Sequence, residues 1–310
     1  MGISRQTILW ASRQAWIGEQ FRKRSFAKRA TARFIPGETI EAALGAATSF
    51  SRDGLTSLVS NLGENVTTAA ELDDVVEHYL DVLGRIGQSR LPCQISIKPT
   101  HLGLDLGEEL CSEHLSTLLA SATEAGSFVW IDMESSAYVD RTIDLFEQAR
   151  ASNENVGICV QSCLYRTERD LERLIACKAA VRLVKGAYSE PSDVGMKRKR
   201  DVDSNFLKLG IRMLDAVASG DGGLPVFGTH DKQILNSLIE QAAALGIEKR
   251  AFEVQMLYGI ARDQQRSLGS AGHEMRVLIC YGAAWFPWYM RRLAERPANV
   301  WFVLRSVFKG

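Results

Sequence analysis

The sequence predicts an α/β protein built as a (β/α)8 barrel of the TIM type, preceded by a basic helical arm. Short apolar runs rich in β-branched residues recur along the chain, and nearly continuous hydrophobicity is typical of parallel strands buried on both faces. Amphipathic segments lie between these runs, and eight strand-and-helix alternations fit a barrel. A doubly wound open sheet gives the same alternation and is the less favoured fold. We therefore expect an arm over residues 1–36 and one barrel domain over residues 37–310.

The predicted elements follow one another in a regular order. The strand runs are residues 56–62, 93–98, 128–133, 156–161, 180–184, 224–229, 252–256 and 275–281. Each run is short and apolar along most of its length, as a buried strand should be. The clearest helical segments are residues 71–86, 112–125, 140–152, 202–217 and 232–245. These segments gather their apolar residues on one face, which is the pattern of a helix that covers a sheet.

The composition is that of a soluble globular protein, with 46% hydrophobic and 24% charged residues. The formal net charge is zero, so electrostatics gives no reason to expect a nucleic-acid partner. The six cysteines show neither a CxxC pair nor zinc spacing, which indicates no metal site and a reducing, cytoplasmic location. The sequence has no apolar run of about 18 residues and no signal-peptide pattern.

The N-terminal arm carries a local excess of positive charge. It holds eight basic residues against one acidic residue, Glu19, and interleaves them with apolar side chains. The basic residues are Arg5, Arg13, Arg22, Lys23, Arg24, Lys28, Arg29 and Arg33. Such an arm can lie on an anionic membrane surface, which predicts peripheral contact with the inner face of the cell membrane. A solvated helical arm that packs on the barrel is an equally good interpretation.

Polar side chains gather at or near the ends of six of the eight predicted strands. They are Lys98, Asp132 with Met133, Gln161, Arg182 with Lys185 and Gly186, Thr229 with His230, and Glu253 with Gln255. The carboxyl ends of barrel strands form one rim, where barrel enzymes place their working residues. One polar strand end would mean little, but six on one rim predict an active site.

The segment after the eighth strand adds a second candidate feature. If it is helical, Trp288, Arg291, Arg292 and Glu295 lie at i, i+3, i+4 and i+7, on one face. Guanidinium forks bind small carboxylates through paired hydrogen bonds, and an indole can cover an apolar ring. An amphipathic helix whose arginines pair with Glu295 explains the same pattern without a ligand. The position after the eighth strand favours a carboxylate clamp, because that helix opens onto the rim.

Lys185 allows two functional interpretations. A desolvated barrel lysine can form a Schiff base, as in a lyase. Alternatively, Lys185 places positive charge beside an anionic cofactor, and Gly186 permits a close approach of the backbone. The sequence has no GxGxxG after a strand, no GxxxxGK[ST], no HExxH and no GxSxG, so the common nucleotide, zinc and hydrolase motifs are missing.

Six short strings in this order and spacing resemble the proline dehydrogenase family. They are ISIK at 95–98, IDME at 131–134, VRLVKGAY at 181–188, THD at 229–231, EVQMLYG at 253–259 and MRRLAE at 290–295. The resemblance runs from about residue 37 to residue 304. Because no aldehyde-dehydrogenase domain follows, we expect the monofunctional bacterial form and not the bifunctional proline-utilisation enzyme.

The resemblance implies a distorted (β/α)8 barrel that binds FAD noncovalently at the strand ends. It also implies oxidation of L-proline to Δ1-pyrroline-5-carboxylate, with electrons passed to a quinone. Carried over by motif, Lys98, Arg291 and Arg292 would bind the substrate carboxylate, and Glu295 would hold the arginines. Asp132 and Arg182 would act in catalysis, and Tyr188, Leu257, Leu278 and Trp288 would line the substrate site. The cofactor would contact Met133, Gln161, Arg182, Val184, Lys185, Gly186, Ala187, Thr229, His230 and Gln255.

The chain departs from the family pattern at several positions. Leu278 and Trp288 stand where the family usually has tyrosine, and Pro99 with Thr100 follows Lys98 where small apolar residues or serine are more familiar. We therefore hypothesise that the reaction class is retained while the substrate has drifted toward another cyclic amino acid, such as hydroxyproline, pipecolate or a biosynthetic analogue. A Trp288 that replaces tyrosine without changing the substrate is an equally good interpretation.

Overall fold

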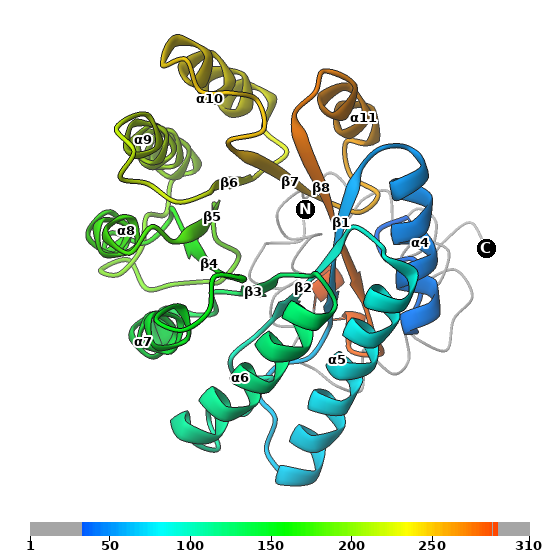
Figure 1. Cartoon of the computed structure of the whole chain (residues 1–310). Helices are drawn as coiled ribbons and strands as arrows, with labels where there is room; N and C mark the ends of the chain where they lie inside the picture. Colours follow the sequence, from blue (N-terminus) through cyan, green and yellow to red (C-terminus); the bar gives the residue numbers. More distant parts are fainter. Residues whose placement is uncertain (1–32, 287, 291–310) are drawn as a thin grey trace, which may run out of the picture.

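The computed structural model of the protein describes residues 33–286 and 288–290. Its eight strands form a closed parallel barrel in which each strand pairs with its neighbours in sequence and β8 pairs with β1 (Figure 1). The strands are β1 (Thr56–Asn61), β2 (Cys93–Ile97), β3 (Val129–Ile131), β4 (Val156–Gln161), β5 (Ala180–Val184), β6 (Pro225–Gly228), β7 (Glu253–Leu257) and β8 (Glu274–Tyr281). The barrel prediction is confirmed, and closure between β1 and β8 excludes the doubly wound sheet.

Helices connect the strands and surround the barrel (Figure 1). They are α4 (Ile40–Arg52), α5 (Ala69–Ser89), α6 (Glu108–Glu124), α7 (Val139–Arg150), α8 (Thr167–Ala176), α9 (Lys199–Ala218), α10 (Lys232–Ala244) and α11 (Arg262–Ser270), with a short 3-10 helix at Ser136–Tyr138. No helix in the described part of the chain is long and apolar enough to cross a membrane.

Helix α5 shows how local sequence fixes these elements. The Thr68 side chain accepts a hydrogen bond from the Glu71 amide at 3.3 Å, and the Glu71 carboxylate accepts one from the Thr67 amide at 3.0 Å. These bonds satisfy amides that a helix start leaves without partners. The helix ends at Arg90, whose backbone takes the left-handed conformation. Between these caps, the buried face of α5 includes Leu72, Val76, Tyr79, Leu83 and Ile86 at helical spacing.

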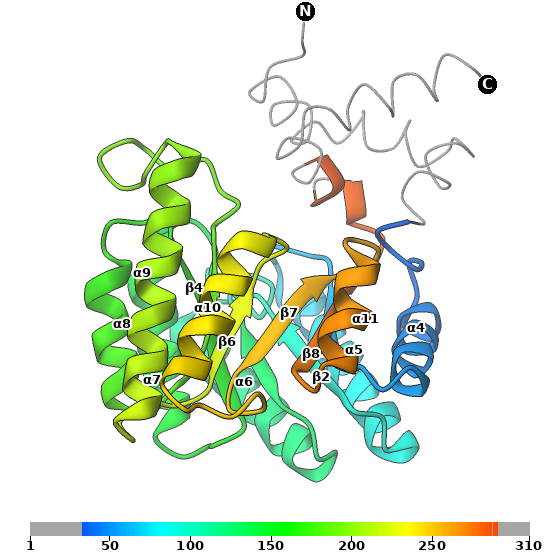
Figure 2. The ribbon, with the colours of Figure 1, turned by 90° about the horizontal axis from the view of Figure 1, so that it is seen from above.

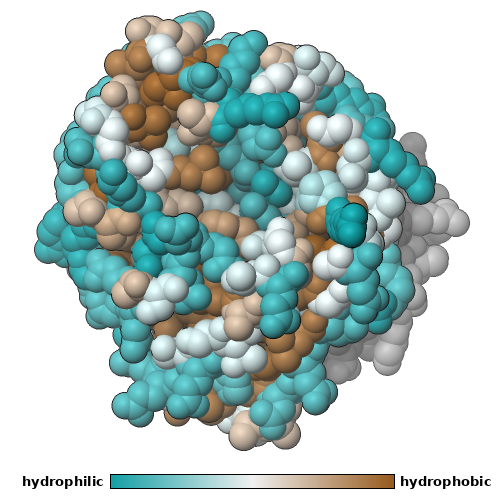
Figure 3. Space-filling model, viewed as in Figure 1, coloured by the Kyte–Doolittle hydropathy of each residue, from teal (hydrophilic) through white to brown (hydrophobic). Residues whose placement is uncertain are grey.

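The apolar core lies mainly between the outer face of the barrel and the helices, whereas the barrel interior is partly polar. A small interior cluster of Leu58, Trp130 and Val226 is buried within the barrel. The face seen in Figure 3 is hydrophilic over much of its periphery, with apolar patches at the upper left and toward the lower part of the view. The segment after β8 rises on one side of the barrel (Figure 2), and its Trp285, Phe286, Trp288 and Tyr289 pack with Leu62, which follows β1. This apolar cluster therefore lies at the end of the barrel where the strands finish.

Candidate active site

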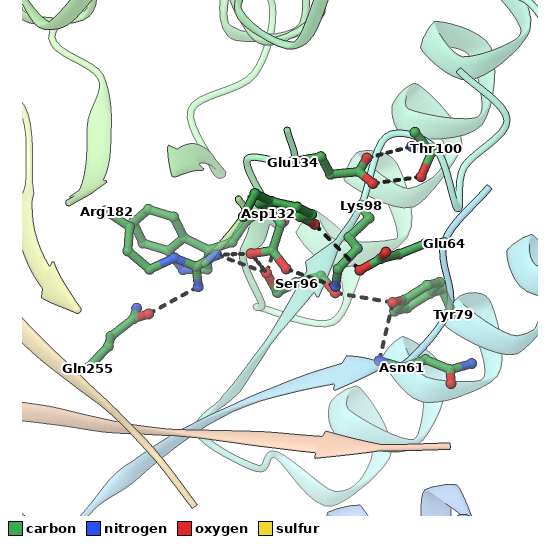
Figure 4. Close-up of polar contacts among 12 residues, drawn as sticks. Asn61, Glu64, Tyr79, Ser96, Lys98, Thr100, Asp132, Glu134, Arg182 and Gln255 are labelled. Atoms are coloured by element: carbon green, nitrogen blue, oxygen red, sulfur yellow. Dashed lines mark hydrogen bonds and ion pairs between the residues drawn. The ribbon is translucent and has the colours of Figure 1, made fainter. Parts of the chain in front are cut away.

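Asp132 is the centre of a charged array in the mouth of the barrel. It follows β3 directly, and its carboxylate accepts hydrogen bonds from Ser96 at 2.8 Å and from Lys98 at 3.4 Å (Figure 4). The same carboxylate forms an ion pair with Arg182 of β5. Three parts of the barrel, at the ends of β2 and β3 and within β5, therefore bring one anion and two cations together.

Arg182 lies inside the barrel, in the middle of its strand, and is 3% exposed. Its guanidinium donates to the Ser96 hydroxyl at 3.0 Å and to the Gln255 side-chain oxygen at 3.1 Å. The guanidinium carbon also lies 5.2 Å from the Trp130 ring centroid, a distance typical of a cation–π contact. These contacts fix the direction of the guanidinium before any ligand binds.

Electrostatics keeps all three members of the array charged. Burial disfavours the Asp132 carboxylate, but the positive charges of Arg182 and Lys98 outweigh burial and lower the pKa of Asp132 below its ordinary value. Burial likewise disfavours the Lys98 ammonium, yet Asp132 and Glu64 raise the pKa of Lys98 above its usual range. At neutral pH Lys98 is therefore a cation and Asp132 an anion, so Asp132 is a poor proton acceptor.

The array continues deeper into the barrel through Gln255. The Gln255 amide donates to the Glu253 carboxylate at 2.6 Å, which leaves its oxygen facing Arg182. Glu253 is the first residue of β7, so its side chain lies below the carboxyl-terminal rim and not on the rim, where we expected it. The expectation that Glu253 belongs to the carboxyl-terminal rim was wrong, because the strand begins at this residue and does not end there.

At Gly186 the backbone passes close to the side chains of Cys163 and Gln161. Its φ of +104° lies in the region that favours glycine, and an added Cβ would lie 2.4 Å from the Cys163 sulfur and 3.1 Å from the Gln161 side-chain oxygen. Gln161 ends β4 and donates to the Glu134 carbonyl at 2.8 Å. The backbone after β5 therefore fits tightly against the end of β4, and no larger residue replaces Gly186 without a rearrangement.

Lys185 lies between two carboxylates. Its ammonium contacts Asp203 at 2.5 Å and Asp231 at 2.9 Å, while Asp231 also caps helix α10. His230, the residue before Asp231, accepts a hydrogen bond from the Leu257 amide at 2.9 Å, which ties the end of β6 to the end of β7. Thr229 is buried and its hydroxyl accepts a hydrogen bond from the Asp231 amide at 3.2 Å.

The predicted apolar wall is assembled from three separate segments. Leu257 at the end of β7 and Leu278 of β8 pack against the hydrophobic cluster that contains Trp288, which is 8% exposed. Tyr188 donates to the Glu64 carboxylate at 3.4 Å, which links the loop after β5 to the loop after β1. Three residues of the predicted carboxylate clamp, Arg291, Arg292 and Glu295, lie outside the described residues, as does almost all of the basic arm.

Several residues of the array were missed in the sequence analysis. Ser96 bridges Asp132 and Arg182, and its place could have been inferred, because Gln94, Ser96 and Lys98 alternate along β2 and so share one face. Glu64 and Arg276 gave no such local signal, because their partners Tyr188 and Glu253 lie 124 and 23 positions away in the sequence. No group of three or more His, Cys, Asp or Glu side chains placed to hold a metal ion occurs in residues 33–286 and 288–290.

The fold and this array define a (β/α)8 barrel with a charged candidate site built from the ends and interior of its strands. The chain belongs to the proline dehydrogenase family, because the family model Proline dehydrogenase matches residues 43–305. Over 278 residues it is 36% identical to Proline dehydrogenase 1 of Bacillus subtilis, which covers 89% of this chain and 90% of that protein. It is also 35% identical over 283 residues to Proline dehydrogenase of Deinococcus radiodurans, covering 90% of each chain.

A solved structure shares the same fold. It is the crystal structure of proline utilization A from Bdellovibrio bacteriovorus inactivated by N-propargylglycine, with a TM-score of 0.81 and 23% sequence identity. The match covers 92% of this chain and 34% of that one, so the present chain spans about a third of its length. At this identity the likeness concerns the barrel architecture.

Proposed function

We propose that this chain oxidises L-proline to Δ1-pyrroline-5-carboxylate, with noncovalently bound FAD as the hydride acceptor and a quinone as the final electron acceptor. The array of Lys98, Asp132 and Arg182 at the barrel mouth carries the proposal, because it supplies a cation for a substrate carboxylate beside a second, buried cation. The family assignment supports proline as the substrate.

The strand ends from β4 to β7 suit a bound FAD. Gly186 keeps the backbone close to Gln161, and residues 184–187 are partly exposed, as a surface that contacts a planar ring requires. The residues that would hold the cofactor are Met133, Gln161, Arg182, Val184, Lys185, Gly186, Ala187, Thr229, His230 and Gln255. When bound, FAD supplies the two-electron acceptor that no amino-acid side chain provides. Arg182 would stabilise negative charge that develops beside it, because its direction is already fixed by Ser96 and Gln255.

Substrate orientation follows from the charges. Lys98, together with Arg291 and Arg292, would bind the substrate carboxylate, and Glu295 would hold the arginine pair. Asp132 would fix the Lys98 ammonium and neutralise part of the local positive charge. Tyr188, Leu257, Leu278 and Trp288 would surround the ring. Such binding holds the ring in one orientation and so converts binding energy into a favourable reaction geometry.

The contacts of Lys185 argue against the rival lyase function. The Lys185 nitrogen is held between the carboxylates of Asp203 at 2.5 Å and Asp231 at 2.9 Å, so attack on a substrate carbonyl would require both contacts to break. Borohydride treatment in the presence of L-proline or an imino product should therefore leave no mass adduct on Lys185. An adduct in the parent protein that is lost in K185M would favour the lyase.

The deciding experiment is an anaerobic titration of the purified protein while its absorption spectrum is recorded. We expect a yellow protein whose flavin bleaches with L-proline, and K98M should need about 10–100-fold more proline for half-bleaching, because one charged hydrogen bond is lost. The exposed K208M provides a matched control, since Lys208 pairs with Glu168 on the surface. Protein without flavin, or flavin that no cyclic amino acid bleaches, would refute the proposal.

A further inference from the structure

We infer that Thr100 and Glu134 form a clasp that holds the Glu64 loop, residues 62–67, beside Lys98, and that Thr100 is thereby a positioning residue for substrate binding. The substrate part of this inference rests on the proposed function, whereas the clasp itself is a property of the resting protein. The clasp joins three loops, which follow β1, β2 and β3 (Figure 4).

At one end of the clasp, both carboxylate oxygens of Glu134 are hydrogen-bonded to protein groups. Glu134 is 3% exposed, and both of its oxygens accept hydrogen bonds from Thr100, one from the hydroxyl at 2.7 Å and one from the backbone amide at 2.9 Å. Burying a carboxylate costs free energy unless such bonds replace those to water. Two bonds to one residue therefore fix Thr100 relative to the end of β3.

The Thr100 end of the clasp holds the Glu64 loop. The Thr100 hydroxyl accepts a hydrogen bond from the Asn65 amide at 3.0 Å, and its carbonyl accepts one from the Val66 amide at 3.1 Å. Asn65 has a φ of +56°, a left-handed conformation that asparagine adopts more readily than most residues other than glycine. Thr100, which is fully buried, therefore supports a tight turn immediately after Glu64.

The position of Glu64 connects this loop to the proposed chemistry. Its carboxylate accepts a hydrogen bond from Tyr188 at 3.4 Å, and its charge helps to keep Lys98 protonated. Figure 4 shows Glu64 beside Lys98, with Thr100 and Glu134 above them in this view. If the loop moves, the negative charge that faces the carboxylate-binding lysine moves as well. The unusual threonine after Pro99 thus acquires a role, because its hydroxyl both donates to Glu134 and accepts from Asn65.

Hydrogen–deuterium exchange on the resting holoprotein tests the clasp without any assay of turnover. T100V removes the hydroxyl, and with it the bonds to Glu134 and Asn65, but keeps the shape. Exchange in a peptide covering residues 62–67 should therefore accelerate at least about fivefold, as expected for loss of the Asn65 bond alone. T100S keeps the hydroxyl and should restore slow exchange. T117V is a matched control, because the Thr117 hydroxyl bonds only to the Glu113 carbonyl of its own helix among the contacts described. It should leave the 62–67 peptide unchanged.

Steady-state kinetics then tests the positioning role. T100V should raise the KM for L-proline about fivefold and change kcat less than about twofold, and T100S should return the KM to the parent value. E134Q keeps one acceptor for Thr100 and should accelerate exchange at 62–67 by a smaller factor than T100V. It also serves as the second variant if T100V does not fold.

The outcomes separate the two proposals. Unchanged exchange at residues 62–67 in T100V, or in E134Q where T100V does not fold, would refute the clasp, whether or not the protein oxidises proline. Faster exchange with an unchanged KM for L-proline would mean that the clasp holds the loop in the resting protein but has no role in substrate binding. A parent protein whose flavin does not respond to proline would refute the proposed function, while the exchange data would still decide the clasp.

Discussion

Arg276 and Glu253 form a two-pronged ion pair inside the barrel, with both nitrogen–oxygen distances at 2.9 Å. Arg276 also donates to the Ser57 carbonyl at 3.1 Å, so one side chain of β8 is bonded to both strands that flank it, β7 and β1. Through Gln255, Glu253 is also connected to Arg182. The seam where β8 pairs with β7 and β1 to close the barrel is therefore joined by hydrogen bonds to the charged array of Lys98, Asp132 and Arg182.

Replacing Arg276 should destabilise the protein strongly. R276M leaves the Glu253 carboxylate, which is 3% exposed, without its main counter-charge. Breaking a buried pair in this way costs about 3–5 kcal/mol, because the remaining charge stays desolvated. Urea unfolding followed by circular dichroism measures the change. R212M is the matched control, since Arg212 makes a similar two-pronged pair with Glu172 on the surface and should cost less than about 1 kcal/mol. Equal losses in the two variants would contradict this account of the seam.

Glu134 should give the stability of the protein a distinctive pH dependence. Burial raises the pKa of Glu134, although the hydrogen bonds from Thr100 oppose this shift. A carboxyl group whose pKa is higher when folded stabilises the protein below its unfolded pKa of about 4.3, and this contribution is lost as pH rises through the folded pKa. The unfolding free energy of the parent minus that of E134Q should therefore fall as the pH rises from about 4 and then level off.

For D132N, the unfolding free energy of the parent minus that of the variant should rise with pH, which is the opposite of the trend for E134Q. The pKa of Asp132 is lowered by Arg182 and Lys98 against the effect of burial, so its contribution is present above the unfolded value of about 3.9 and is lost as pH falls through the lower folded pKa. Urea unfolding of the three proteins between about pH 3 and 7 measures both differences. A parent-minus-E134Q difference that stays flat or rises with pH would mean that Glu134 is not destabilised by burial.

Much of the fold could be predicted because the strand signals are local. Each of the eight predicted strand runs overlaps one observed strand, and two predicted runs, 156–161 and 180–184, match β4 and β5 at both ends. Helix α5 extends to Ala69–Ser89, beyond the predicted 71–86, because Thr68 and Glu71 cap its start. That capping pattern is itself readable from the sequence.

The site was predicted in part, for a similar reason. Lys98, Asp132 and Arg182 were identified from motifs, and the structure brings them together. Their partners depend on barrel closure and on side-chain direction, which local sequence does not specify. Arg276 meets Glu253 only because β8 lies between β7 and β1, and Glu64 meets Tyr188 across 124 positions of the chain.

The basic arm gives a separate prediction about membranes. Deleting residues 1–32 should reduce cosedimentation with vesicles that contain anionic lipid, because each Lys or Arg near such a surface contributes about 1 kcal/mol of attraction. Neutral vesicles are the control, and binding to them should be weak for both proteins. If the deletion leaves cosedimentation with anionic vesicles unchanged, the arm is not a membrane contact.

The apolar wall of Leu257, Leu278 and Trp288 should make the enzyme discriminate against a hydroxylated ring. One of the tyrosines expected here is replaced by Leu278, which has no hydrogen-bonding group, so a ring hydroxyl buried against Leu278 lacks a partner there. Such an unsatisfied group costs about 1–3 kcal/mol, which corresponds to a loss of about 5–150-fold in kcat/KM for trans-4-hydroxy-L-proline relative to L-proline. L-Pipecolate, whose extra methylene is apolar, should be disfavoured less.

Single substitutions in the wall assign this selectivity to particular residues. L278Y and W288Y each return a hydroxyl. Each should lower the ratio of kcat/KM for L-proline to kcat/KM for trans-4-hydroxy-L-proline. W285Y is the matched control, because Trp285 is buried in the same cluster but its indole donates to Glu38 at 2.9 Å. W285Y should lower stability while leaving the substrate ratio unchanged. If W288Y and W285Y shift the ratio equally, Trp288 acts through packing of the cluster, and substrate drift must be sought at Leu278 instead.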